Sequence, residues 1–195
     1  MHVLTVIDHP KSTSFTHAIA ERFGEGAREA GHTTETADLH AEGFNPAWSL
    51  LDIDVGETQP APEGVLAEQA RIERCDALAL VFPLFWWGMP AMLKGWVDRV
   101  WTYGWAYDDV DDPNRSLQPA RSCVMLVPCG ASPQSMAPHG YPGAMSKIWD
   151  TGTLGYFGMT DTQIHLLHGS HGSDERRSGL LDTTFRAGRD LKPPS

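Results

Sequence analysis

Residues 77–101 constrain the fold more than any other stretch of the chain. They begin with an uninterrupted apolar run at 77–82, which is typical of a buried strand. A short aromatic loop follows, and its large rings are Phe85, Trp86 and Trp87. After Pro90 the apolar residues recur at helical spacing, and proline is well tolerated at the start of a helix. The stretch predicts a strand, a loop and a helix, and such a loop binds ligands in open parallel sheets. The three rings favour stacking on a planar ligand, and a hydrophobic partner surface is the alternative.

The same pattern recurs along the chain. Five strands are predicted, most of them from apolar or β-branched runs, at 3–7, 33–39, 77–82, 122–127 and 163–167. Helical patterns follow most of them, including one at 144–157, so the sequence predicts an α/β fold. We expect a single domain over residues 1–195, a three-layer α/β/α sandwich around a five-stranded parallel sheet. Ligand loops after the first and third strands match the flavodoxin-like strand order 2-1-3-4-5.

Composition argues against several classes of function. The net charge is −10 over 195 residues, which disfavours binding to nucleic acid or to an anionic membrane. No run of about 18 apolar residues occurs, so no membrane-spanning helix is expected. The N-terminus starts with a strand pattern and lacks a basic region, so no signal peptide is expected. Three cysteines without metal or disulfide spacing predict reduced thiols in a cytoplasmic protein.

A hydroxyl-rich loop after the first strand is a candidate phosphate site. It combines hydroxyl donors, free backbone N–H groups and the positive end of a helix dipole. The alternative is that Ser12, Thr13 or Ser14 only caps the helix that follows. Neither the glycine fingerprint of dinucleotide sites nor a Walker motif is present, so hydroxyls would contribute more than glycines.

Two polar stretches and a group of histidines lie outside this pattern. Residues 40–62 and 108–119 are acidic and rich in turn formers, so both are expected to be surface loops. His165, His168 and His171 could hold a metal only if they shared one helix or loop. The strand predicted at His165 argues against that, and no metal site is expected.

Three motifs carry a resemblance to a known family. His9-Pro10 is followed by Thr13-Ser14-Phe15, and Ala106-Tyr107 lies further along the chain. The most specific motif spans residues 82–100 and contains Pro83, Leu84, Trp86, Gly88, Pro90 and Trp96. On these motifs the chain resembles the NAD(P)H:quinone oxidoreductases of the flavodoxin-like superfamily. That family includes modulators of drug activity and ancillary subunits of potassium-efflux systems.

The resemblance implies a flavin, FAD or alternatively FMN, bound at the interface of a homodimer. The residues implied for its phosphates and ribityl chain are His9, Thr13, Ser14, Phe15 and Thr16. Those implied for its ring are Pro83, Leu84, Phe85, Trp86 and Trp87. Tyr107, with Trp105 beside it, would wall the substrate pocket of the neighbouring subunit. Trp96 and Trp101 lie on the helix, where core or dimer packing is expected instead.

The loop after the fourth strand departs from the family pattern. Many relatives have Thr-Thr-Gly-Gly there, whereas this chain has Pro128-Cys129-Gly130-Ala131, in which proline removes an N–H donor. Cys129 and Gly130 remain candidate flavin contacts, although a purely structural thiol is the alternative for Cys129. His139 and Tyr141 are candidates for the catalytic pair that stabilises charge on the flavin. The alternative is that both are ordinary loop residues.

The function implied by the resemblance is that of an NAD(P)H dehydrogenase (quinone). Hydride would pass from NAD(P)H through the flavin to a quinone or related acceptor by a ping-pong mechanism. The alternative is a flavin-bound regulatory subunit of a potassium-efflux type of transporter, with little turnover. A flavodoxin-like electron carrier is disfavoured by the aromatic motif. The sequence leaves open the choice between NADH and NADPH and the identity of the acceptor.

Overall fold

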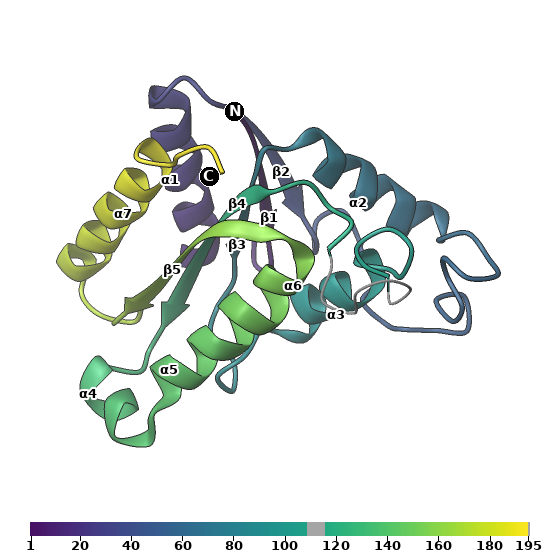
Figure 1. Ribbon diagram of the computed structural model, residues 1–195. Coiled ribbons are helices and arrows are strands. Elements are labelled where there is room, and N and C mark those ends of the chain that lie inside the picture. Colours follow the sequence, from purple (N-terminus) through teal and green to yellow (C-terminus); the bar gives the residue numbers. More distant parts are fainter. Residues whose placement is uncertain (109–115, 195) are drawn as a thin grey trace.

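The computed structural model describes residues 1–108 and 116–194 (Figure 1). One parallel sheet forms its centre, with the strand order β2-β1-β3-β4-β5. The strands are β1 (His2–Ile7), β2 (Thr33–Asp38), β3 (Ala77–Val81), β4 (Arg121–Cys129) and β5 (Met159–His168). The predicted strand order 2-1-3-4-5 is confirmed. The loop predicted at 108–119 falls largely outside the residues that the structure describes.

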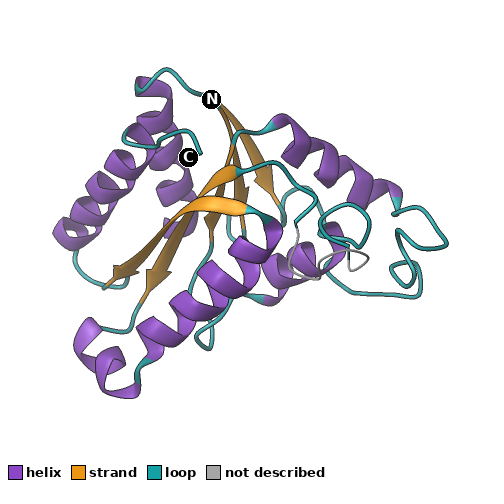
Figure 2. Cartoon of the chain, viewed as in Figure 1, coloured by secondary structure: helices purple, strands orange, loops and turns teal. Residues whose placement is uncertain are grey.

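Helices cover both faces of the sheet (Figure 2). On one face, α1 (Phe15–Glu29) and α7 (Asp174–Arg189) pack side by side (Figure 1). The other face carries α2 (Glu63–Arg74), α3 (Ala91–Val100) and a helical stretch after β4. That stretch comprises α4 (Pro133–Met136), η1 (Ala137–His139), α5 (Tyr141–Ser146), η2 (Lys147–Leu154) and α6 (Gly155–Phe157). None of the helices described is long and apolar enough to cross a membrane.

The central strand β3 is apolar throughout because each of its faces meets a helical layer. In β3, Ala77, Ala79 and Val81 pack toward α1 and α7. Leu78 and Leu80 point the other way and join the core beneath α2 and α3. Successive side chains of a strand point to opposite faces, so both alternating sets of β3 side chains are buried in apolar surroundings.

Two predicted elements differ from those observed. β5 starts at Met159, four residues before the predicted strand. The prediction was too short because β5 is an edge strand, and its first residues are polar and show only a weak hydrophobic pattern. The predicted helix at 144–157 is interrupted by η2, which is π-helical. Trp149 and Leu154 of η2 are both buried although they are five residues apart, as the wide π turn allows.

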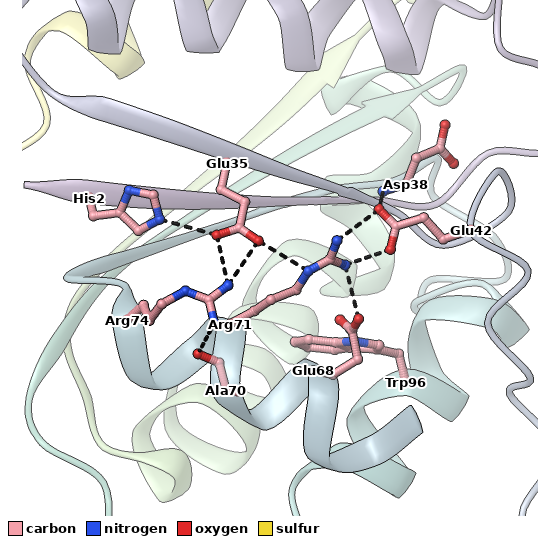
Figure 3. Close-up of polar contacts among 9 residues, drawn as sticks. All are labelled: His2, Glu35, Asp38, Glu42, Glu68, Ala70, Arg71, Arg74 and Trp96. Atoms are coloured by element: carbon pink, nitrogen blue, oxygen red, sulfur yellow. Dashed lines mark hydrogen bonds and ion pairs between the residues drawn. The ribbon is translucent and has the colours of Figure 1, made fainter. Parts of the chain in front are cut away.

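An ion-pair network fixes α2 to the neighbouring strand and to α3 (Figure 3). The Arg71 guanidinium donates to Glu42 at 3.1 Å and to Glu68 at 2.9 Å, and lies 3.1 Å from Glu35 of β2. Glu68 in turn accepts a hydrogen bond from the indole Nε1 of Trp96 at 2.9 Å. Trp96 itself is completely buried, as expected for a packing residue of α3.

Candidate active site

A cavity of about 670 Å³ opens where β1, β3, β4 and β5 end. Because these strands are parallel, the loops that follow them meet at one edge of the sheet. The loop after β1 contributes hydroxyls and a histidine, and the loop after β3 contributes apolar side chains. The loops after β4 and β5 add a thiol, glycines and cationic or hydroxyl groups. The cavity therefore has a polar side and an apolar side.

The loop after β1 brings together all the residues predicted to hold phosphates. Those lining the cavity are His9, Thr13, Ser14, Phe15 and Thr16. Ser14 is the N-cap of α1, because its Oγ accepts a hydrogen bond from the backbone N–H of His17 at 3.2 Å. The interpretation as a helix cap is thus correct for Ser14, and the same residue also faces the cavity. Burial is the main cause that lowers the pKa of His9, so its neutral imidazole is favoured.

The aromatic loop after β3 contains a strained turn. Phe85 and Gly88 exchange two backbone hydrogen bonds, of 3.3 and 2.9 Å, so that Trp86 and Trp87 form the turn between them. Both tryptophans have positive φ angles, 49° and 64°, in the left-handed region that such tight turns require. Asparagine and glycine normally occupy these positions, and a bulky residue there is strained.

The strained turn displays its two rings in different ways. Trp86 is 96 % exposed. Trp87 stacks on Tyr141, with ring centroids 4.0 Å apart, and Tyr141 stacks on His139 at 5.2 Å. The predicted catalytic pair, His139 and Tyr141, therefore lies behind the aromatic loop. Neither of the two residues lines the large cavity.

A second cavity, of about 240 Å³, adjoins the first. Leu84, Cys129 and Gly130 line both cavities, and Trp86 and Trp87 line only the second. Together the two cavities gather all the predicted cofactor residues, including Pro83 and Phe85.

The loop after β4 contributes a protonated thiol. Burial raises the pKa of Cys129 to about 11, so the thiol is not a nucleophile near neutral pH. Its Sγ lies 3.3 Å from Nδ1 of His168, which also lies 2.8 Å from the carbonyl oxygen of Ala131. Pro128 lacks an N–H, but its carbonyl accepts a hydrogen bond from the backbone of Leu84 at 3.0 Å. Pro128 thus anchors the aromatic loop, although its segment departs from the family pattern.

The β5–α7 segment also lines the large cavity, although no sequence motif pointed to it. Ser170, His171 and Gly172 line the large cavity, as does Arg177 in the first turns of α7. The guanidinium of Arg177 lies 4.5 Å from the centroid of the Phe15 ring, and its buried Nε has no hydrogen-bond partner among the described residues. A buried donor of this kind, on a cationic group, fits an anionic ligand. The sequence offered one signal for these residues, namely that the predicted fifth strand must also end at this edge of the sheet.

Asp8 was also missed, and it joins two of the loops. Its carboxylate is 2 % exposed and accepts a hydrogen bond from the backbone N–H of Leu93, in the first turn of α3, at 2.8 Å. Nε2 of His40 lies 2.9 Å from the other carboxylate oxygen. Asp8 therefore fixes the start of α3, and with it the aromatic loop, to the end of β1.

The two predicted substrate residues lie elsewhere in the chain. Trp105 donates from its indole Nε1 to Glu73 at 2.8 Å and packs near Phe157. Tyr107 lines a separate cavity of about 390 Å³ between α3 and the η2–α6 stretch, where its ring contacts Tyr156. The structure does not bring either residue to the large cavity of the same chain. Their role in a neighbouring subunit stays a prediction.

Comparisons with known proteins agree with this architecture. A family described as having a flavodoxin-like fold matches residues 1–186. NAD(P)H dehydrogenase (quinone) 1 of Cavia porcellus is 31 % identical, covering 91 % of this chain and 72 % of that protein. An uncharacterized NAD(P)H oxidoreductase of Haemophilus influenzae is 28 % identical, covering 93 % of this chain and 91 % of its own.

A solved structure is similar over almost the whole chain. The NAD(P)H:quinone oxidoreductase from Methanothermobacter marburgensis superposes with a TM-score of 0.90 at 35 % sequence identity. The superposition covers 98 % of this chain and 99 % of that one.

Proposed function

Because this chain belongs to the flavodoxin-like family and, within it, to the NAD(P)H:quinone oxidoreductases, we propose that it is a flavin-dependent enzyme of that activity. Its donor is NAD(P)H and its acceptor is a quinone or a related compound. We also propose that it works as a cytoplasmic homodimer, as the resemblance implies. Neither the described residues nor the relatives reported above favour the alternative of a transporter subunit.

The observation that carries the proposal is the pairing of two chemistries in adjoining cavities. The polar side offers the hydroxyls of Thr13 and Ser14, the start of α1 and the Nε of Arg177, which has no partner among the described residues. The apolar side offers Leu84 and the strained tryptophan turn. A phosphorylated molecule with a flat ring fits this donor set, and a flavin is such a molecule.

A bound flavin would supply the hydride chemistry between NAD(P)H and the acceptor. The chain's own residues would bind and orient the flavin and shield it from water. Thr13, Ser14 and Arg177 hold the phosphates, and Leu84 and Trp86 cover the ring and exclude water. Tyr141 stacks on Trp87 and His139 stacks on Tyr141, so this pair would support the aromatic loop, and its role as the catalytic pair stays a proposal.

We propose FAD rather than FMN as the flavin. Donors flank the polar side from two loops, the hydroxyl loop after β1 and the Ser170–Arg177 segment after β5. Two sets of donors suit a diphosphate better than a single phosphate. Acid release of the flavin from purified protein, followed by chromatography, distinguishes the two cofactors.

The proposed activity is tested by stopped-flow spectroscopy of the purified protein. NADPH or NADH without acceptor should bleach the flavin absorbance, and a quinone added afterwards should restore it. Steady-state rates at several fixed quinone concentrations should give parallel double-reciprocal lines, as a ping-pong mechanism requires. A protein that is colourless, and remains so after FAD or FMN is added, would contradict the proposal.

A further inference from the structure

The hydroxyl of Ser14 is shared between the candidate phosphate site and a partly buried histidine. Ser14 lines the large cavity, and its Oγ lies 2.8 Å from Nδ1 of His17. Nε2 of His17 lies 2.9 Å from Oδ2 of Asp38 at the end of β2. The His17 and Asp38 side chains are only 17 % and 19 % exposed. The three groups form a chain of hydrogen bonds that runs from β2 to the cavity.

In the neutral state of His17, this chain leaves Ser14 with the wrong polarity for an anion. Asp38 can only accept, so the proton of neutral His17 sits on Nε2 and Nδ1 carries a lone pair. The Ser14 hydroxyl then donates its hydrogen to Nδ1. Its oxygen already accepts the N-cap hydrogen bond from the His17 backbone. Only an oxygen lone pair of Ser14 is left to face the cavity, and a phosphate oxygen needs a donor.

Protonation of His17 reverses the polarity of Ser14. One proton from solvent adds to Nδ1, which then donates to Ser14 Oγ, and no other covalent bond changes. The Ser14 hydrogen becomes free to point into the cavity and donate to a phosphate oxygen. Asp38 lies against the imidazolium and offsets its charge.

We propose that His17 is a positioning residue, which takes up one proton when the phosphate of a flavin binds in the cavity. The inference rests on the proposed function, since it concerns the phosphates of the flavin. It assigns to His17 and Asp38 the orientation of the Ser14 hydroxyl, and with it a pH-dependent affinity for phosphorylated flavins.

The ionisable groups around His17 are consistent with this assignment. Although burial raises the pKa of Asp38, hydrogen bonds from His17 and from backbone N–H groups outweigh it and hold the pKa below its ordinary value. Asp38 therefore stays a carboxylate in both states.

The remaining neighbours come from the ends of β1 and β2. The ring of His9 meets that of His17 edge to face at 6.3 Å, and burial lowers the pKa of His9, so His9 favours the neutral form. Asp8 and His40 pair with each other at 2.9 Å. Lys11 lines the cavity, and Glu42 accepts a hydrogen bond from the Asp38 backbone at 3.3 Å.

The test compares FAD with riboflavin, which has the same ring but no phosphate. Calorimetric titration of the flavin-depleted full chain, in buffers with different heats of protonation, counts the protons taken up on binding. FAD is preferred to FMN, because a phosphate monoester itself titrates near pH 6. We expect uptake of up to one proton with FAD and close to none with riboflavin. Affinity for FAD should fall about tenfold per pH unit above the range in which histidine titrates.

Variants identify the group that takes the proton. His17→Gln should still bind FAD but lose the proton uptake and flatten the pH dependence. His40→Gln should keep the uptake, since His40 pairs with Asp8 and does not line the large cavity. Imidazole ¹⁵N NMR of the wild type gives a second measurement that needs no variant. Nδ1 of His17 should be protonated with FAD bound and unprotonated with riboflavin at the same pH.

Several results would overturn the inference. They are equal uptake in wild type and His17→Gln, equal uptake with FAD and riboflavin, loss of uptake in His40→Gln, or an unprotonated Nδ1 with FAD bound. In each of these cases flavin still binds, so the proposed function stands. A wild-type chain that binds neither flavin contradicts the proposed function and this inference together.

Discussion

Trp86 and Trp87 hold backbone angles that large side chains rarely adopt. Each left-handed residue of this kind costs about 1–2 kcal/mol. The cost is not recovered by burial of Trp86, whose ring is 96 % exposed. Strain that persists without a packing gain points to a role in ligand binding, here the covering of a flat ring.

Trp86→Asn tests this role, because asparagine tolerates the left-handed region. We expect the free energy of unfolding of the flavin-depleted chain to rise by about 0.5–1 kcal/mol. Flavin retention should weaken between about two- and tenfold, as expected for the loss of one stacked ring. Urea denaturation and equilibrium dialysis of the flavin measure the two effects. Unchanged retention would remove Trp86 from the proposed site.

Substitution of Trp96, in the same motif, should lower stability and leave flavin retention unchanged. It is completely buried and donates to Glu68 at 2.9 Å. Trp96→Phe removes that donor, leaves a buried carboxylate with one partner fewer and opens a cavity. We expect a loss of about 2–4 kcal/mol in the free energy of unfolding, with flavin retention unchanged while the protein is folded. If retention fell as much as in Trp86→Asn, the division of the motif into ligand and packing parts would be wrong.

At the scale of elements, the attachment of α2 to the sheet depends on Arg71. Arg71 has three carboxylates within hydrogen-bonding reach, those of Glu35, Glu42 and Glu68 (Figure 3). Its side chain is 22 % exposed, whereas that of Arg74, one turn further along, is 56 % exposed. Without Arg71, three negative charges would face one another beside the sheet.

Arg71→Ala should therefore destabilise the chain far more than Arg74→Ala does. We expect about 2–4 kcal/mol for Arg71, since the change leaves a largely buried carboxylate without its cation. For Arg74 we expect at most about 1 kcal/mol, the usual value of an exposed ion pair. Denaturant titrations at low and high salt measure both. Similar losses in the two variants would contradict a special role for Arg71.

At the scale of the whole molecule, α1 and α7 pack closely enough for backbone atoms to touch. A Cβ added to Gly26 of α1 would lie 2.0 Å from the carbonyl oxygen of Phe185 in α7. The two helices carry opposite sides of the candidate phosphate site, with Ser14 at the start of α1 and Arg177 near the start of α7. Their close packing therefore sets the spacing between these donors.

Gly26→Ala should force the helices apart. We expect a loss of about 2–3 kcal/mol in the free energy of unfolding together with weaker flavin retention. Gly179→Ala is the matched control on α7, since among the described residues its added Cβ would meet nothing within 4 Å beyond its chain neighbours and the backbone of its own helix. It should stabilise the chain by about 0.5–1 kcal/mol through helix propensity, without changing retention. Equal effects of the two substitutions on retention would show that the spacing of the helices does not matter.

The sequence by itself determined the sheet, its strand order and the loops that form the candidate site. Apolar runs buried on both faces identify central strands, and parallel strands end at one edge, so loops such as 8–14 and 82–90 had to meet. Periodicity also placed Trp96 in the core. These features depend on short stretches of chain, in which residue type and spacing carry the information.

Only the tertiary structure decided which side chains complete the site. Arg177 and Asp8 contribute through contacts with residues far away in the sequence, Phe15 and Leu93. The choice of Ser14 among three possible caps, and the separation of Tyr107 from the large cavity, were likewise invisible in the pattern. Such contacts leave no periodic pattern in the sequence, because they depend on how the helices and strands pack and on the direction in which each side chain points.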